Sequence, residues 1–466
     1  MLTSIRNIFR LQGIAWVLIK HRALFPLARI RLFRVIYYPF RILELFPSKK
    51  RRGERLTEAL YELGPIFIKV GQILSTRPDI IGTEIANDLA KLRDHLPAFN
   101  FENAEKTIEK ELGVKISDMF TDFSKEPVAA ASIAQVHRAK TKDGHDVAVK
   151  ILRPAIEKQF AVDLKLFKWL VKLIDYTYKP IQKFRLSDFI DRIADGIKIE
   201  LDLRMEAAAA SQLKENMQND VNIYIPKIYW NYTARRVMTM EWIDGISIYD
   251  TNKLIEAKLD LKKISANFAI MFFNQAYQNG FYHADLHPGN VLIDKKGRIV
   301  LIDFGIIGRL DLKNRLFVAE TLYGFLKHDY NKIADIHYKY GFVKEDKSRQ
   351  LFAQACRAIG EPIIGMPVSQ ISIGKLLSQL LKVAEDFDME IRHEIVSLQK
   401  TIMLVEAIGF SLNPEVNMWK LIEPWIEEWA LKHLSIEARI LNFVKVVAKH
   451  IIQELPEDIV KKYEKA

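Results

Sequence analysis

Two short motifs in the second half of the chain place side chains at a spacing that suits phosphoryl transfer. Asp285 stands two residues after His283 and five residues before Asn290, and an Asp-Phe-Gly triplet begins at Asp303. Phosphoryl transfer needs a residue that orients or deprotonates the acceptor, and hard oxygen ligands for Mg²⁺. We therefore predict Asp285 as the base or positioning residue, and Asn290 and Asp303 as the metal ligands.

Further parts of the same kind of site stand upstream. The strand-like run 147–150 ends in Lys150, which in kinase-like sites contacts phosphates and pairs with a helix glutamate, for which Glu206 is the best candidate. Glu241 and Ile243 are expected to lie in the hinge that meets the adenine ring through backbone groups. Each motif alone has an ordinary structural explanation, such as a strand end or a capped turn. Their joint order and spacing predict a kinase-like site.

The sequence also departs from ordinary protein kinases. No Gly-x-Gly-x-x-Gly loop precedes Lys150, and Ala284 stands where the catalytic triplet usually has arginine. No Ala-Pro-Glu segment follows Asp303, so an ordinary peptide-docking site is not expected. Alanine restricts the backbone where glycine would let it close over phosphates, which predicts an altered nucleotide cradle. The residues of that cradle are Ala129, Ala130, Ala131 and Ser132.

Hydrophobic periodicity predicts an α+β chain that fits a two-lobed nucleotide-binding fold. Strands are expected at 128–132, 135–140, 147–152, 225–230 and 237–240, and helices over most of 57–120, 155–217 and from 243 onward. The uncharged run 264–284 is interpreted as a buried core helix, and no segment is expected to span a membrane. The expected regions are a basic segment 1–56, a helical extension 57–120, a smaller lobe with a long helical insert 121–243, and a helical lobe with its tail 244–466.

The charge of the chain is concentrated at its beginning. Residues 1–56 hold thirteen Lys/Arg and two Asp/Glu, which matches the net charge of +11 for all 466 residues. Between Pro26 and Pro39, one helical face carries Arg31, Arg34 and Tyr38. The opposite face is apolar, which favours a helix in an anionic membrane interface over a solvated helix docked on the protein. Aliphatic interleaving and the lack of a nucleic-acid-binding signature argue against nucleic acid.

Other signals are weaker. The single cysteine, Cys356, excludes an intrachain disulfide and a cysteine zinc cluster, and it fits a reducing compartment. No secretory signal is visible, whereas a mitochondrial presequence stays open. The segment 436–453 suits an amphipathic tail helix or core packing equally well.

Three further motifs resemble the UbiB family of atypical kinase-like proteins, the group that includes the mitochondrial ADCK proteins. They are the Lys-x-Gly-Gln string 67–72 with its continuation 74–79, the alanine-rich loop continuing to His137, and Glu200-Leu201-Asp202. The match covers about residues 57–310. It implies a two-lobed protein-kinase-like fold with a helical N-terminal extension and a helical C-terminal region. It also implies a lid, formed by the helix that carries Lys69, Gly71 and Gln72. This helix would cover the place where a protein kinase binds its peptide substrate, and Lys69 and Gln72 would approach Glu200 and Asp202.

The resemblance implies an ATPase that binds ATP or ADP with Mg²⁺ and supports ubiquinone biosynthesis by mobilising quinone precursors. Its expected place is the cytoplasmic face of the bacterial inner membrane, or else the mitochondrial inner membrane, as a peripheral protein. Expected partners are an anionic membrane surface, lipids or quinone precursors, and other ubiquinone-biosynthesis enzymes. Many bacterial relatives end in transmembrane helices and this chain does not, so integral insertion is not expected. The alternatives are a catalytically weak, nucleotide-gated scaffold for lipid-modifying enzymes and a small-molecule kinase.

Overall fold

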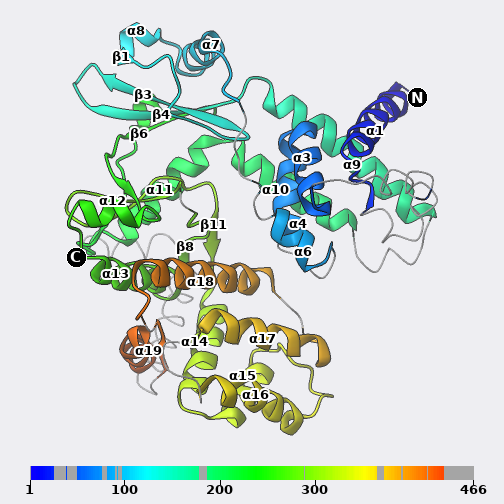
Figure 1. Cartoon of the computed structure of the whole chain (residues 1–466), viewed down its shortest axis with the longest axis vertical. Helices are drawn as coiled ribbons and strands as arrows, with labels where there is room; N and C mark the ends of the chain where they lie inside the picture. The colour runs from blue at the N-terminus through cyan, green and yellow to red at the C-terminus, as the bar shows by residue number, and fades with distance from the viewer. Residues whose placement is uncertain are drawn as a thin grey trace, which may run out of the picture. The chain divides into compact units, whose positions relative to one another are not determined.

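The computed structural model separates into two compact units, each described by itself (Figure 1). The first unit comprises 1–208 and 227–242, and the second comprises 209–226 and 243–466. The structure describes residues 2–25, 38, 50–75, 81–89, 92, 97–177, 186–287, 289–364, 372–389, 392–416 and 418–434. The predicted basic face at Arg31 and Arg34, residues 76–79 of the Lys-x-Gly-Gln continuation and the tail 436–453 lie outside these residues.

An antiparallel sheet forms the centre of the first unit. Its order is β1 (Phe120–Phe123), β3 (Ala134–Thr141), β4 (Asp146–Leu152) and β6 (Val237–Glu241), and β2 (Ala129–Ala130) also pairs with β3. A tight turn joins β3 to β4, in which Gly144 takes a left-handed φ of 83° and donates its N–H to the Thr141 oxygen. In this register Lys150 lies between Val136 and Met238 on the neighbouring strands.

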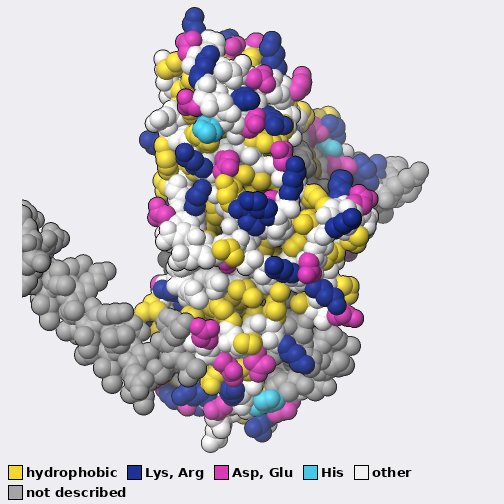
Figure 2. All heavy atoms as spheres, turned by 90° about the vertical axis from the view of Figure 1, so that its left-hand side faces the viewer, with side chains coloured by type: hydrophobic (Ala, Val, Ile, Leu, Met, Phe, Trp, Pro, Cys, Tyr) yellow, Lys and Arg dark blue, Asp and Glu magenta, His cyan; other side chains and the backbone are white. Residues whose placement is uncertain are grey.

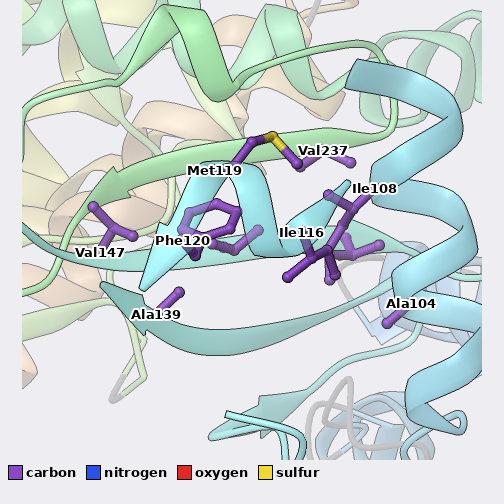
Figure 3. Packing of buried hydrophobic residues seen from close by; sticks show 10 residues of the cluster. Ala104, Ile108, Ile116, Met119, Phe120, Ala139, Val147 and Val237 are labelled. Carbon is purple, nitrogen blue, oxygen red and sulfur yellow. The ribbon is translucent and has the colours of Figure 1, made fainter. Parts of the chain in front are cut away.

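One face of this sheet is covered by α7 (Phe101–Leu112) and α8 (Ile116–Met119). Ile108 of α7 and Met119 of α8 pack against Phe120, Val147 and other side chains of the sheet (Figure 3). Because strand side chains alternate between faces, such a buried cluster fixes the strand register. It therefore fixes the position of Lys150 on β4.

The remaining helices of the first unit include α4, which carries the predicted lid residues Lys69, Gly71 and Gln72. They are α1 (Leu2–Lys20), α3 (Arg52–Leu63), α4 (Pro65–Ser75), α6 (Thr83–Leu89), α9 (Ile156–Thr177), α10 (Leu186–Glu200) and α11 (Leu203–Asn216), whose last turns belong to the second unit. Gly64 ends α3 with a φ of 105°, and Pro65 begins α4, where its missing N–H costs nothing. A salt bridge from Arg10 to the buried Asp163 joins α1 to α9.

The second unit holds two small sheets. One has the order β5 (Ile223–Tyr224), β10 (Ile299–Leu301), β9 (Val291–Ile293) and β7 (Ile246–Ser247), and the other pairs β8 (Phe281–His283) with β11 (Ile307–Arg309). The helices are α12 (Thr251–Glu256), α13 (Leu261–Phe273) with its π-helical continuation Asn274–Asn279, α14 (Leu312–Leu326), α15 (Tyr330–Lys339), α16 (Arg349–Ile364), α17 (Ile373–Asp386), α18 (His393–Leu412) and α19 (Met418–Leu434).

A buried carboxylate orders the start of α17 in this helical region. The carboxylate of Glu406 on α18 accepts the N–H groups of Ile373 and Gly374 and the Ser372 hydroxyl, at 2.6, 3.1 and 2.6 Å. It thus caps the first turn of α17, whose N–H groups have no partner within their own helix.

By length and composition α18 is apolar enough to cross a membrane, but 56% of its apolar window is buried, and α18 packs on α13 and α17.

Several sequence predictions need correction. The strand expected at 225–230 is wrong: this stretch makes one bridge, Ile228 to Met240, and then a short 3₁₀ turn. The region from 243 onward is mainly helical, but β7 to β11 were missed because strands of two or three residues carry no periodic signal. The core helix expected at 264–284 ends at Asn279. Gly280 then adopts a left-handed φ of 63°, and the buried strand β8 follows.

Candidate functional site

Lys150 and Glu206 form a buried ion pair in the first unit. The Lys150 Nζ lies 2.6 Å from Oε1 of Glu206, with side-chain exposures of 11% and 8%. β4 supplies the lysine, and the first turn of α11 supplies the glutamate, where a negative charge is favoured by the helix dipole. A buried ammonium needs such a partner because desolvation penalises an isolated charge. The pairing expected from the sequence is therefore present in the geometry.

The alanine-rich loop is a tight hairpin. Ala129 and Ala130 pair with β3, and the Ala131 N–H donates to the Ala134 oxygen at 2.7 Å. The Arg153 guanidinium donates to the Ala131 oxygen through Nε at 3.0 Å and Nη2 at 2.8 Å. Ser132 at the turn is buried. The backbone of this loop is thus tied to β3 and to Arg153, unlike a loop built from glycines that is free to close.

The predicted hinge begins at the end of β6. The Glu241 N–H donates to the Lys227 oxygen at 2.8 Å, and the Glu241 carboxylate accepts the Lys227 N–H at 3.1 Å. The Trp242 N–H donates to the Asp146 oxygen at 3.0 Å. Ile243 is the first residue of the second unit on this stretch, so the hinge prediction falls on the boundary between the units.

The Lys-x-Gly-Gln segment lies on α4 and pairs with α10. The Lys69 Nζ lies 2.7 Å from Oε1 of Glu200, and both side chains are mostly buried. Asp202 instead binds the Arg204 side chain at 2.6 and 2.9 Å. This hydrogen bond lowers the pKa of Asp202. Lys69 therefore meets the first of the two acidic residues expected around it.

Gly71 is required by close packing rather than by an unusual backbone. A Cβ at this position would lie 2.4 Å from Cδ1 of Leu92 and 2.6 Å from Cδ1 of Leu60. The absence of a side chain lets α4 approach α3 at this point. The same helix carries Lys69 and Gln72, so Gly71 helps to set their position.

In the second unit, His283 connects the two segments that carry the predicted catalytic residues. Its Nδ1 accepts the Asp285 N–H at 3.2 Å, and its Nε2 donates to the backbone oxygen of Asp303. Complete burial lowers the pKa of His283 to about 4, so the ring is neutral, as this pair of bonds requires. This role of His283 was not predicted from the sequence, where only its spacing from Asp285 was used.

Asp285, Asn290 and Asp303 come together around that histidine. The Asn290 amide nitrogen donates to the backbone oxygen of Asp285 at 2.9 Å and to its Oδ2 at 3.4 Å. Oδ1 of Asp303 accepts the Gly305 N–H at 3.0 Å. Tyr249 donates its hydroxyl to the Leu286 oxygen at 3.3 Å, next to Asp285. Sequence reasoning also missed this tyrosine, whose pKa is raised to about 12 by burial and by the Asp285 charge.

The chemistry of these groups fits Mg²⁺. The amide nitrogen of Asn290 is used as a donor toward Asp285, so its oxygen faces away from that bond and is the atom suited to a metal. Within the described part of the chain, no group of three or more His, Cys, Asp and Glu side chains is arranged to hold a metal alone. Mg²⁺ commonly takes one or two carboxylate or carbonyl oxygens from protein and completes its shell with water and phosphate. Asn290 and Asp303 provide such a partial set.

The fold and these motifs define an atypical protein-kinase-like protein. A model of the ABC1 atypical kinase-like domain matches residues 91–337, and a model of the UbiB helical domain matches residues 356–417. A solved structure of Rv3197 from Mycobacterium tuberculosis, in complex with erythromycin, is similar over 77% of this chain and 91% of that chain, with a TM-score of 0.55 and 25% identity.

Curated bacterial relatives identify the family more narrowly. A protein of Marinobacter nauticus named "Probable protein kinase UbiB" is 38% identical over 98% of this chain and 84% of its own length. A protein of the same name from Pseudomonas fluorescens is 37% identical over 95% of this chain and 84% of its own. The chain belongs to the UbiB family. The predicted family and the α+β kinase-like fold with helical regions at both ends are thereby confirmed.

Proposed function

We propose that this chain is an atypical kinase-like ATPase that supports ubiquinone biosynthesis at a membrane surface. The observation that carries the proposal is the Lys150–Glu206 ion pair, which is buried although removing two charges from water costs desolvation energy, and which holds the lysine where kinase-like sites place it. The set of Asp285, Asn290 and Asp303, held by His283, supports it. Family membership agrees with the role in ubiquinone biosynthesis.

Each residue has a proposed role at the nucleotide. Lys150 binds phosphate oxygens, and Glu206 orients Lys150. Asp285 positions the attacking group through hydrogen bonding, and Asn290 and Asp303 hold Mg²⁺, which neutralises charge on the phosphates when bound. The hairpin Ala129, Ala130, Ala131 and Ser132 covers the phosphates, while backbone groups at Glu241 and Ile243 meet the adenine of ATP or ADP.

Water, rather than a protein hydroxyl, is the proposed acceptor. The ion pair of Lys69 with Glu200 holds α4 against α10, and the sequence carries no Ala-Pro-Glu segment for an ordinary peptide site. We propose that Lys69, Gly71, Gln72, Glu200 and Asp202 form the family's lid. ATP hydrolysis would then drive the mobilisation of a lipid or quinone precursor. The phosphoryl group would not be transferred to a protein.

The membrane part of the proposal draws support from α1. It exposes Phe9 and Trp16, each 68% accessible, and it also carries the basic residues Arg10 and Lys20. Aromatic and basic side chains on one helix suit a membrane interface. Elsewhere basic and acidic side chains are interspersed, as the face in Figure 2 shows. The curated relatives are bacterial, so the proposed place is the cytoplasmic face of the inner membrane, with other ubiquinone-biosynthesis enzymes as partners.

Phosphate release from ATP tests the proposal. The full chain is assayed with Mg²⁺, with and without anionic liposomes, beside the variants Asp303→Asn and Lys69→Ala. We expect turnover in the wild type, stimulation by liposomes and loss of turnover in Asp303→Asn. Tight nucleotide binding without phosphate release would instead support the nucleotide-gated scaffold. Transfer of phosphate to a small metabolite would support the small-molecule kinase.

A further inference from the structure

Gln275 is a fully buried polar side chain that has no role in the nucleotide site described above. It is 0% exposed and lies in the π-helical turn Asn274–Asn279, which continues α13. Such turns are rare and occur frequently at functional sites. Gly280 ends this turn, and β8 with His283 follows at once. The unusual turn therefore stands directly before the segment that carries Asp285.

The side-chain amide of Gln275 has a defined orientation. Its Oε1 accepts the backbone N–H of His283 at 3.1 Å. Because an N–H group can only donate, the amide oxygen faces β8 and the amide nitrogen faces away from this bond. Nε2 is buried and has no hydrogen-bond partner among the residues that the structure describes. A buried unpaired donor costs stability, so a methionine of similar length would pack at lower cost. Packing alone therefore does not explain a glutamine here.

The π-helical turn that carries Gln275 is held by two other helices of the second unit. Trp425 of α19 donates its indole N–H to Oδ1 of Asn274 at 2.7 Å. Arg315 of α14 donates to the backbone oxygens of residues 277 and 278, at 3.2 and 2.7 Å. These donors fix the turn before and after Gln275. The amide oxygen of Gln275 is thus a fixed point against which β8 is placed.

His283 carries the position of its backbone to two segments. Its ring accepts the Asp285 N–H through Nδ1 at 3.2 Å and donates through Nε2 to the backbone oxygen of Asp303. Gln275 holds the backbone of this same residue. The chain of bonds therefore runs from the π-helical turn through His283 to both predicted carboxylates.

We propose that Gln275 is a positioning residue that sets the spacing between Asp285 and Asp303 by holding the backbone of His283. The inference deepens the proposed ATPase function and rests on it for its effect on turnover. Without the Gln275 oxygen, β8 loses its hydrogen bond to the π-helical turn, and the ring of His283 no longer has a fixed place. Reaction rates are sensitive to this kind of displacement, because a shift of about 1 Å can cost about a hundredfold.

Two variants separate positioning from folding. Gln275→Met removes the acceptor and keeps the length of the side chain. It leaves the His283 N–H unpaired but also removes the unpaired amide nitrogen, so the two effects on stability offset each other and the thermal midpoint should stay close to that of the wild type. Gln275→Glu keeps an acceptor oxygen at the same place, because burial favours the neutral carboxyl group.

Gln399→Met is the matched control. Gln399 is also a buried glutamine of the second unit, but its amide nitrogen donates to the Gly374 oxygen at 3.4 Å and to the Met403 sulfur at 2.8 Å. It has no hydrogen bond to β8 or to the segment at Asp303. This variant loses a buried amide, as Gln275→Met does, without touching the chain of bonds through His283.

Steady-state ATP hydrolysis with Mg²⁺ gives the first readout. We expect kcat of Gln275→Met to fall about tenfold or more, with the KM for ATP within about twofold of the wild type, because the proposed phosphate contacts of Lys150 do not involve Gln275. Gln275→Glu should recover most of the lost kcat, and Gln399→Met should keep both constants. A wild-type kcat in Gln275→Met would overturn the inference. An equal loss of kcat in Gln275→Glu would overturn it as well.

Hydrogen exchange of the nucleotide-free full chain separates this inference from the proposed function. The backbone amides of His283 and Gly305 are followed by mass spectrometry with fragmentation. Gly305 donates to Oδ1 of Asp303 at 3.0 Å, so its amide reports on the segment that Gln275 does not bond. Both amides should exchange faster in Gln275→Met and not in Gln399→Met. Faster exchange at His283 alone would show a local role and overturn the inference. If the wild type hydrolyses no ATP, the proposed function fails, and the exchange at Gly305 alone decides the inference.

Discussion

Removing the carboxylate of Glu206 should destabilise the first unit far more than removing both charges of its ion pair. In Glu206→Leu, the Lys150 ammonium, 11% exposed, loses the carboxylate that lies 2.6 Å away. Breaking a buried pair from one side costs about 3–5 kcal/mol, because the remaining charge stays desolvated. The double variant Lys150→Met with Glu206→Leu removes both charges and should cost much less.

Urea denaturation of the wild type, the two single variants and the double variant gives the coupling free energy directly. Lys198→Met is the control, since Lys198 pairs with Asp195 on the surface and both side chains are more than two thirds exposed. It should leave the midpoint unchanged. If Glu206→Leu shifts stability no more than this control does, the pair is not desolvated and the argument for a functional reason to bury it fails.

Three further outcomes follow from the packing. Burial depresses the pKa of His283 and His337 to about 4, below the unfolded value of about 6.5, so each stabilises the fold above pH 6.5 and loses that contribution as pH falls toward 4. His337→Phe should make the fall in unfolding free energy shallower, by up to about 3 kcal/mol at pH 4. Gly71→Ala should cost about 1–2 kcal/mol in urea denaturation, because its Cβ meets leucine methyls, whereas Gly13→Ala, with nothing within 4 Å, should not destabilise. Glu406→Ala should cost about 2–3 kcal/mol and lower the thermal midpoint, since it leaves buried N–H groups at the start of α17 unpaired; an unchanged midpoint would contradict the capping role.

The sequence was most informative where chemistry demands particular residue types. Lys150 and Glu206 were predicted as partners although 55 residues separate them, because in kinase-like sites the lysine that ends this strand pairs with a helix glutamate. The same holds for Asp285, Asn290 and Asp303, which the second unit gathers. Their roles at a nucleotide stay predictions.

Elements without a periodic signal could not be predicted. The expected strand at 225–230 contains Pro226, which has no N–H to donate to a neighbouring strand. The stretch makes a single β-bridge, from Ile228 to Met240. The strands β8 to β11 are only three residues long and take their shape from their neighbours. Nor does the sequence distinguish His337, buried on an amphipathic helix, from an ordinary core histidine. Only the three-dimensional structure shows that Nε2 of His337 has no hydrogen-bond partner among the described residues.

The two bonds of His283 have a consequence for turnover. With Nε2 committed to the Asp303 backbone and Nδ1 to the Asp285 backbone, neither nitrogen can shuttle a proton during the reaction. The ring instead links the backbone at Asp303 to the backbone at Asp285, so a movement of one segment displaces the other. A rate profile that titrates between pH 5 and 8 would therefore have to be assigned to some other group.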